Sequence, residues 1–591
     1  MSRSGALAGC REQAAPIQAT EFAVKTRSDE AETLTSTWQP AYFALLACLV
    51  MSAGLVAFYL YWIEPLVFLP ADILMWAETD FVGDIIKLRI GAPIYTPPGD
   101  SNSLIYTPAA PMLTYAISWI IGSPTSIAAW RLIQLGFVSC AALLATSCCR
   151  KLYRLAFPQH RTAFSKTWLC FTFLAMLLAG TAPRTNSFVY TLHADALALL
   201  VSVFSFWTLL LYMEAPGWRR VLLMAVCPAL GYLTKQLLIV WSIVMFLFLI
   251  LNDHRRWERV ALFAGAAGAF IVIAVGVCYL LWGDAFIFWT FTVMGGDRKR
   301  VNFSIDAHGL SLLRSLEHTL RAWLDIAVGI VGGWLILHGA NIRRLGPLWI
   351  AWLVLIAGEA FSSGAGWGVL YHFGPGVLIG SIWLFAALPM VWPRIESHVD
   401  GSVLLSSSAQ SLAMMTGVLT VFMMLHVVPT AEGEGRSWQR PGGLADVYRY
   451  IADIEREFDG LPADKVLLDV GNWIYLRHSV LAKDRAISLA DQPAGGIYAN
   501  TNVMVSRIQS NTYEKILVRD FHSPYFLYDW PTVGVGHWER PSGIRKALLE
   551  NYEEVRVIPA PTGASELQQQ IAHIGPVSVL VPKRGANTPS N

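Results

Sequence analysis

Two carboxylates stand two residues apart just after the first long apolar run, in the stretch 76–80 (WAETD). Glu78 and Asp80 are candidates for a general base, because an attacking hydroxyl needs a carboxylate within hydrogen-bond reach to take its proton. We predict that both lie in a loop at a membrane surface. The alternative is that they are ordinary surface acids of a solvated loop.

Other ionisable residues stand inside or at the rim of apolar runs, where charge is costly and usually faces a polar cavity. They are His193, Asp195, Lys235 with Gln236, Glu359, and Tyr371 with His372; Arg298, Lys299 and Arg300 form a separate basic cluster. A leaving phosphate develops negative charge, which Lys, Arg, His or a metal ion can stabilise. The joint pattern of an acid pair and several cations on one face predicts glycosyl transfer from a lipid-phosphate sugar.

Each of these residues also has a structural alternative. The Arg298–Arg300 cluster could bind anionic headgroups at the interface. His193 and His372 could be interfacial anchors or satisfied core histidines, and Lys235 could snorkel to the headgroup region. Glu359 could be a packing partner for a nearby Ser or Arg.

The elements that must position these residues are membrane helices. The 591-residue chain is 54% hydrophobic and only 15% charged, and its repeated long apolar runs are typical of transmembrane segments. The sequence therefore predicts a polytopic α-helical membrane protein with about 11 spans plus interfacial helices. The expected spans are 40–62, 127–148, 167–183, 193–213, 220–234, 235–251, 260–282, 321–338, 347–363, 370–392 and 403–428.

The basic links between these spans predict the topology. If the links at 150–166, 219–220, 254–259, 343–344 and 394 are cytoplasmic, the N-terminus lies inside and the C-terminus outside. Residues 1–38 are then a disordered cytoplasmic tail, 39–428 the membrane domain with an outer loop at 63–126, and 429–591 an extracytoplasmic domain. The apolar stretch 107–122 is short for a span and is expected to lie at the outer interface.

The C-terminal 160 or so residues change character, with more Gly, Pro and charge. Short β-like runs alternate with helical patterns, which predicts a small α/β domain with a mainly parallel sheet. The expected strands are 465–469, 486–489, 515–519, 555–558 and 577–581, and the expected helices are 444–458, 498–510 and 541–551. No glycine-rich phosphate loop occurs here, so a substrate-capping or structural role is favoured over nucleotide binding.

Several motifs resemble those of a known superfamily. The E-x-D stretch is followed by G-x-x-I-Y at 91–95 and Y-x-P-x-x-P at 106–111, and LHADALALL at 192–200 and LTKQ at 233–236 follow later. This order resembles the GT-C superfamily of polyprenyl-phosphate-sugar glycosyltransferases, over roughly residues 40–400. Within it, the likeness is to the bacterial, family 39-type group of protein mannosyltransferases and aminoarabinose transferases.

The resemblance implies roles for the candidate residues. An acidic catalytic residue is implied in the first outer loop, as Glu78 or Asp80. Those relatives that carry Asp-Glu at this loop have the pair adjacent, whereas this chain has Glu-Thr-Asp, so the choice stays open. The donor phosphate would be bound by Lys235, Gln236, Arg298, Arg300, Tyr371 and His372, in a cavity also lined by His193, Asp195, Tyr106 and Glu359. Some members use a divalent cation such as Mg²⁺ or Mn²⁺ and others do not.

The resulting hypothesis is an inverting glycosyltransferase of a bacterial inner membrane. It would move a hexosyl or pentosyl group from a polyprenyl phosphate to a glycan, lipid or protein acceptor at the outer face, with no nucleic-acid partner. One alternative is a polymerase or ligase for lipid-linked oligosaccharides. Another is a transporter or scaffold without chemistry, although such proteins typically show half-repeats or charges near the bilayer midplane.

Overall fold

The computed structural model describes most of two regions of the chain, the helical region and the C-terminal domain. The described residues are 53–54, 57, 67–74, 76–98, 100, 102–159, 166–182, 185–186, 188–253, 256–294, 301–302, 310–339, 342–364, 370–399, 421, 441–484, 501–522, 543–561 and 574–583. Residues 55–391 and 421–591 belong to one compact unit.

The helical region follows the apolar runs of the sequence. Its α-helices are α2 (Trp76–Ile90), α3 (Ala109–Ile120), α4 (Ile127–Ala156), α5 (Lys166–Gly180), α6 (Asp195–Glu214), α7 (Trp218–Thr234), α8 (Val240–Asn252), α9 (Trp257–Ile287), α11 (Leu312–Arg321), α12 (Trp323–Gly339), α13 (Ile342–Ser363) and α14 (Gly374–Val399). Shorter elements are the 3₁₀ turns η1 (Gln236–Ile239) and η3 (Leu370–Phe373), the π-helical turn η2 (Phe288–Val293), and the paired strands β1 (Val301–Asn302) and β2 (Leu310–Ser311).

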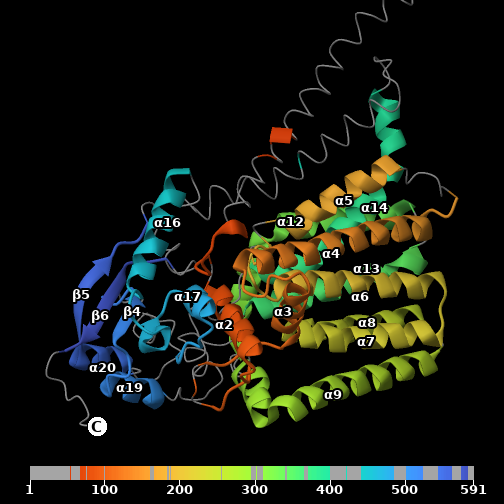
Figure 1. Ribbon diagram of the computed structural model, residues 1–591. Helices are drawn as coiled ribbons and strands as arrows, with labels where there is room; N and C mark the ends of the chain where they lie inside the picture. The colour runs from red at the N-terminus through yellow and green to blue at the C-terminus, as the bar shows by residue number, and fades with distance from the viewer. Residues whose placement is uncertain are drawn as a thin grey trace, which may run out of the picture. The chain divides into compact units, whose positions relative to one another are not determined.

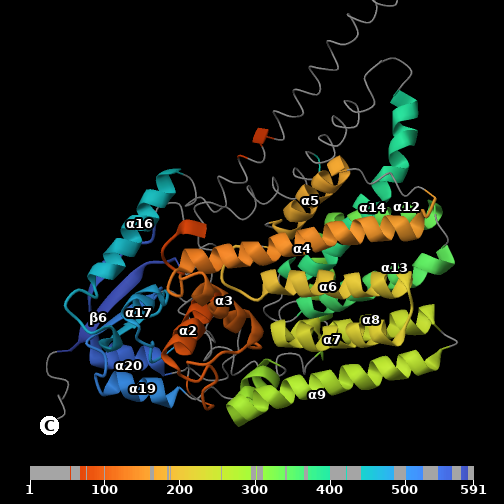
Figure 2. The ribbon, with the colours of Figure 1, turned by 45° about the vertical axis from the view of Figure 1, so that its right-hand side comes forward.

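The long helices pack side by side. Helix α4 packs on α5 and α6, α6 on α7, α7 on α9, and α8 on α13 (Figures 1 and 2). In the outermost of these, α9 with η2, only 17% of the most apolar 18-residue stretch is buried, as expected for a helix that faces lipid. Ser126 precedes helix α4, and its hydroxyl accepts a hydrogen bond from the Ala129 amide at 3.2 Å and so caps the first turn.

Each expected span that the structure describes coincides with a helix. Among the described residues, four helices are long and apolar enough to cross a membrane: α4, α6, α9 with η2, and α13. The pair α11 and α12, bent by 70°, would make a fifth. Helices α3, α5, α8 and α14 are apolar but shorter by the same measure. The predicted polytopic helical class is confirmed, whereas the count of eleven stays a prediction because the runs at 40–62 and 403–428 lie almost wholly outside the described residues.

The C-terminal domain contains a four-stranded sheet with helices packed on it. Its helices are α16 (Pro441–Arg456), α17 (Trp473–His478), α19 (Asn502–Gln509) and α20 (Ile544–Asn551), with the 3₁₀ turn η5 (Ala463–Lys465). Its strands are β3 (Val466–Leu468), β4 (Lys515–Arg519), β5 (Tyr552–Ile558) and β6 (Val577–Pro582). The α/β class and the three expected helices are confirmed; the expected strand 486–489 lies outside the described residues.

The prediction of a mainly parallel sheet is wrong. The strand order is β3-β4-β6-β5, and only β3 and β4 run parallel, with Val466 opposite Lys515. Strand β6 runs antiparallel to both of its neighbours, and its pairing with β5 has a bulge between Glu554 and Arg556. Alternation of helices and strands suggested parallel crossovers, but it does not reveal that the last strand inserts between two earlier ones.

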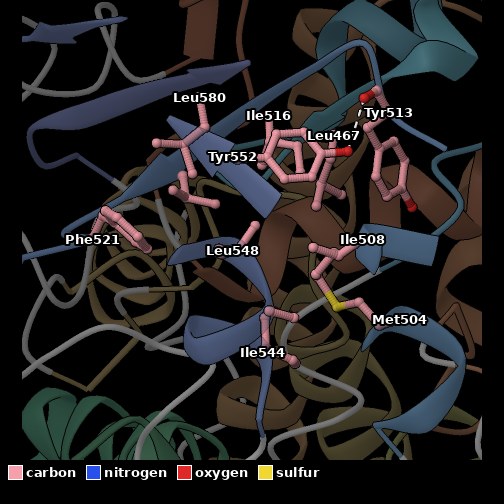
Figure 3. Close-up of a cluster of buried hydrophobic side chains, with 12 residues drawn as sticks. Leu467, Met504, Ile508, Tyr513, Ile516, Phe521, Ile544, Leu548, Tyr552 and Leu580 are labelled. Carbon is pink, nitrogen blue, oxygen red and sulfur yellow. Dashed lines mark hydrogen bonds between the residues drawn. The ribbon is translucent and has the colours of Figure 1, made fainter. Parts of the chain in front are cut away.

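A compact apolar cluster stabilises this domain. Leu467, Ile516 and Leu580 project from three different strands toward α19 and α20, which contribute Met504, Ile508 and Leu548 (Figure 3). Tyr552 closes the cluster, and its hydroxyl donates a hydrogen bond to the Tyr513 carbonyl at 2.9 Å. This region contains no cysteine, so apolar contacts and not a disulfide join its sheet to α19 and α20.

Candidate active site

Both candidate bases lie in the first turns of helix α2, and the prediction that they lie in a loop is therefore wrong. The stretch WAETD continues into FVGDIIKLRI without a helix-breaking proline, so the helical hydrogen bonds run through it. An α-helix turns by about 100° per residue, so the side chains of residues 78 and 80 leave the axis about 200° apart. Glu78 and Asp80 therefore face different surroundings.

Glu78 is occupied by a bidentate ion pair with Arg131 of helix α4. The guanidinium Nε and one terminal nitrogen each lie 2.7 Å from a Glu78 carboxylate oxygen, and both side chains are fully buried. The Leu192 amide also donates to this carboxylate at 3.1 Å. Arg131 in turn donates to the carbonyls of Leu69 (2.6 Å) and Ala71 (2.8 Å). Two backbone segments, 69–71 and the one that contains Leu192, are thus joined to helices α2 and α4 at this ion pair.

Asp80 lies on the other side of α2, together with residues that sequence reasoning did not select. Asp84, at i+4, and Lys87, at i+7, share its face. The Lys87 ammonium lies 3.3 Å from an Asp84 oxygen and donates to the carbonyls of Ile94 (3.2 Å) and Asn102 (2.6 Å). Lys87 therefore folds the outer loop back over the face that carries Asp80, whose side chain is also buried.

Three charged or polar side chains are linked in a row at the start of helix α6. The His193 ring nitrogen Nδ1 lies 2.6 Å from one oxygen of Asp195, and the Lys235 ammonium lies 2.5 Å from the other. Asp195 stands in the first turn of α6, where the helix dipole favours an acid. The His193 side chain is buried.

Aromatic rings connect this charged chain to α2. The His193 ring centroid lies 5.1 Å from that of Phe81, 5.6 Å from that of Tyr106 and 4.7 Å from that of Phe188. Phe81 directly follows Asp80 in the helix, and its ring stacks on Tyr106 at 5.5 Å. The acid-bearing helix and the lysine that binds Asp195 therefore belong to one packed assembly.

Lys235 is placed by an interruption between two helices. Helix α7 ends at Thr234, Lys235 is extended (φ −157°), and the single turn η1 follows before α8 begins. Leu238 then lies so close to Gly231 that a Cβ there would meet the Leu238 Cβ at 2.9 Å. The sequence anticipated a break here from two unusually short apolar runs. The break lets the lysine project sideways into the bundle.

The lysine faces a cavity between helices. Polar side chains of Asp195, Lys235, Glu359 and His372 line it, and its volume is about 10 Å³, which is about the room that one water molecule needs. One Glu359 oxygen accepts from the Gly376 amide at 2.9 Å, and the other is buried with no hydrogen-bond partner among the described residues. The Ser362 hydroxyl lies 3.2 Å from His372 Nδ1.

The structure thus brings together five of the residues selected from sequence: His193, Asp195, Lys235, Glu359 and His372. Tyr106 touches the same assembly through His193. Gln236 does not, because its side-chain amide donates to the Ile105 carbonyl at 3.3 Å. Arg298 and Arg300 lie outside the described residues, and of Tyr371 only the backbone, in η3, is described.

Arg131 was missed, although a lone arginine inside an apolar helix is itself a signal of a buried acidic partner. As for a metal ion, no three His, Cys, Asp or Glu side chains in the described ranges converge as its ligands would.

Comparison with known proteins establishes the fold. No family model matches the chain, and neither does any curated protein sequence. Among solved structures, ArnT from Cupriavidus metallidurans bound to undecaprenyl phosphate is similar, with a TM-score of 0.54 and 13% identity over 91% of this chain and 99% of that one. The oligosaccharyltransferase AglB from Archaeoglobus fulgidus, with an inhibitory peptide and a dolichol-phosphate, gives a TM-score of 0.44 and 12% identity over 93% and 78% of the two chains. The chain therefore shares the fold of the ArnT structure, and the predicted fold class of a polytopic helical membrane protein is confirmed.

Proposed function

We propose that this chain, with its GT-C fold, is a membrane glycosyltransferase that takes a sugar from a polyprenyl phosphate and passes it to a glycan, lipid or protein acceptor. The observation that carries the proposal is the cavity where Lys235, Asp195, Glu359 and His372 meet. In the similar ArnT structure the bound molecule is undecaprenyl phosphate, which is a lipid-linked anion. A lysine at a cavity inside an apolar bundle matches that chemistry, because the lipid tail favours the bilayer and the phosphate needs a cation.

The reaction requires one base and one cation. Asp80 takes the proton of the acceptor hydroxyl, whose oxygen attacks the anomeric carbon of the sugar. The new carbon–oxygen bond forms as the bond from that carbon to the phosphate oxygen breaks, and polyprenyl phosphate leaves. Attack from the side opposite the leaving group inverts the anomeric configuration. Lys235 then stabilises the charge on the departing phosphate.

The assignment of Asp80 in place of Glu78 is supported by what the Glu78 carboxylate touches. The Glu78 oxygens already accept two bonds from Arg131 and one from the Leu192 amide. A carboxylate whose two oxygens are both held in this way is not placed to meet an acceptor hydroxyl. Asp80 lies on the opposite side of the same helix, under the outer loop.

The side of the membrane is part of the proposal. The basic links that predict a cytoplasmic N-terminus put α2 and Lys235 at the outer face, where an acceptor of the cell envelope would meet the donor. We propose the inner membrane of a bacterium as the location, since polyprenyl-phosphate sugars and surface glycans would both be accessible there.

The test is sugar transfer by membranes that contain the protein, with a panel of labelled undecaprenyl-phosphate sugars as donors. Asp80→Asn should lower transfer by about 100-fold or more, which is the usual contribution of a general base. Lys235→Met should lower it by about 100- to 1000-fold. Lys151→Met is the matched control, because Lys151 also pairs with a carboxylate (Glu214, 2.7 Å) but is partly exposed and lines no part of this cavity.

Two results would contradict the proposal. If Asp80→Asn retains full transfer, Asp80 is not the base. If wild-type membranes release no sugar from any donor of the panel, the chain does not catalyse this transfer.

A further inference from the structure

The C-terminal domain touches the segment that carries the candidate base. The Asp72 carboxylate, just before helix α2, accepts hydrogen bonds from the backbone amide of Asn472 at 2.8 and 3.0 Å, one to each oxygen, and from that of Trp473 at 2.9 Å. Asp72 is completely buried. At Gly471 an added Cβ would lie 2.8 Å from an Asp72 oxygen and 2.6 Å from the Trp473 ring, so only glycine allows this approach.

The side chain of Asn472 makes a second contact, next to the acid itself. Its amide nitrogen donates to the Thr79 carbonyl at 2.7 Å, and Thr79 is the residue between Glu78 and Asp80. The Thr79 hydroxyl donates to the Asp72 carbonyl at 3.0 Å. One asparagine of the C-terminal domain is thus bound both to the entry of α2 and to its first turn.

The asparagine is itself held on the sheet of its domain. It immediately precedes α17, whose Tyr475 hydroxyl donates to the Val466 carbonyl at 2.7 Å and accepts from the Leu468 amide at 2.9 Å. These two groups belong to strand β3. A short path of hydrogen bonds therefore runs from the sheet through α17 and Asn472 to α2.

The same segment also holds the outer loop. The Asn102 side-chain amide donates to the Ala482 carbonyl. Asn102 in turn provides the carbonyl that accepts from Lys87 on α2. Contacts to residues 472–482 therefore fix the start of α2 and the loop that covers its Asp80 face.

We propose that Asn472 is a positioning residue. Through its contacts with the Thr79 carbonyl and the Asp72 carboxylate, the C-terminal domain holds helix α2 in the position in which Asp80 meets the acceptor hydroxyl. This deepens the proposed function and rests on it. A base must lie about 2.6–3.2 Å from the hydroxyl whose proton it takes. A displacement of about 1 Å can cost about 100-fold in rate, even when the reacting groups are unchanged.

The informative variant is Asn472→Asp. It preserves the size of the side chain and the backbone amide that Asp72 accepts, but it places a carboxylate oxygen against the Thr79 carbonyl. We expect kcat for sugar transfer to fall about 10-fold or more while the donor KM changes less than about 2-fold. Hydrogen exchange of the α2 amides should become faster, because the first turn loses a support.

The matched control is Asn551→Asp. Asn551 lies in the same domain and also donates its side-chain amide to a backbone carbonyl, that of Ala547 at 2.8 Å, within helix α20 and its flank. This control should leave both kcat and the exchange of α2 unchanged. Asn472→Ala removes the amide without adding a charge and should reproduce the direction of both effects, which covers the case in which Asn472→Asp does not fold.

The exchange measurement does not depend on sugar transfer. If α2 exchanges at the wild-type rate in both Asn472 variants, the positioning role is wrong, whatever the activity. It is also wrong if the donor KM rises while kcat is preserved, because Asn472 would then act on donor binding. If the wild type transfers no sugar, the proposed function fails, while faster exchange in the variants would still support the contact between the C-terminal domain and α2.

Discussion

Replacing Glu78 by Gln tests whether this carboxylate holds the site together or takes part in the chemistry. The neutral amide leaves the fully buried guanidinium of Arg131 without its counter-charge. Breaking a buried ion pair by removing one partner typically costs about 3–5 kcal/mol. The two carbonyls that Arg131 also contacts, those of Leu69 and Ala71, remain bound, so the loss should stay within that range. Transfer per folded molecule should be preserved within a few-fold.

The double variant Glu78→Met with Arg131→Met refines this prediction. Replacing a buried ion pair by apolar groups removes the desolvation cost of both charges and is often close to neutral. Here the Leu192 amide and the carbonyls of Leu69 and Ala71 lose their partners, at about 1–3 kcal/mol each. The double variant should therefore be less destabilised than the sum of the two single variants, which gives a favourable coupling energy for the pair.

The assay is chemical denaturation of the detergent-solubilised protein, with Glu317→Gln as control. Glu317 pairs with Arg321 on helix α11, where the two side chains are 36% and 62% exposed, so its loss should cost less than about 1 kcal/mol. The reasoning is refuted if Glu78→Gln is no more destabilising than the control. It is equally refuted if the variant is stable and transfers no sugar, because Glu78 would then belong to the chemistry.

Three further predictions concern other contacts. At Gly376 an added Cβ would lie 2.2 Å from a Glu359 oxygen, so Gly376→Ala should lower the free energy of unfolding by about 1–3 kcal/mol and should lower sugar transfer. Gly346→Ala is the control and should change neither, because no atom lies within 4 Å of the Cβ that it adds. Tyr475→Phe leaves the Leu468 amide and the Val466 carbonyl of strand β3 without the hydroxyl to which they are hydrogen-bonded. It should destabilise the C-terminal domain by about 2–6 kcal/mol, measured by denaturation. Burial raises the pKa of Asp72 from 3.8 to about 7, so between these pH values the folded state holds a proton that the unfolded state has released. The free energy of unfolding should therefore fall as the pH rises from about 4 to 7. Asp72→Asn should remove this pH dependence, measured as the denaturation midpoint at several pH values.

The fold was accessible from sequence where local chemistry decides it. Apolar runs predicted the helices because a bilayer requires about 20 apolar residues in a helix, and the pairing of two short runs around Lys235 predicted the break there. The same reading failed in the C-terminal domain. Helix and strand positions depend on local patterns, whereas strand direction depends on which strands pair, and β6 pairs with two strands that lie before it in the chain.

The site was predicted in part, for a related reason. Costly polar residues in apolar surroundings identified Asp195, Lys235, Glu359 and His372, and these do converge. The choice of Asp80 over Glu78 that we propose could not be made from sequence, because it depends on Arg131, which is far away in sequence, and on α2 being a helix. The contact between Asn472 and Thr79 joins residues 393 positions apart. No composition or spacing reports such a contact, since it exists only once two domains have folded.

The size of the cavity adds a requirement to the mechanism. At about 10 Å³ it has room for one water molecule, whereas sites for molecules the size of a sugar phosphate enclose several hundred Å³. Binding therefore has to move elements of the wall. The wall contains a candidate hinge at Lys235 and η1. Lys235 is extended between two helices, and η1 is a single 3₁₀ turn with few internal hydrogen bonds to break. In the reaction proposed above, Lys235 would exchange Asp195 for the entering phosphate, while Asp195 retains its contact with His193. The Lys235 ammonium then always has a counter-charge. Widening the cavity therefore costs less free energy than it would if the buried ammonium lost its partner.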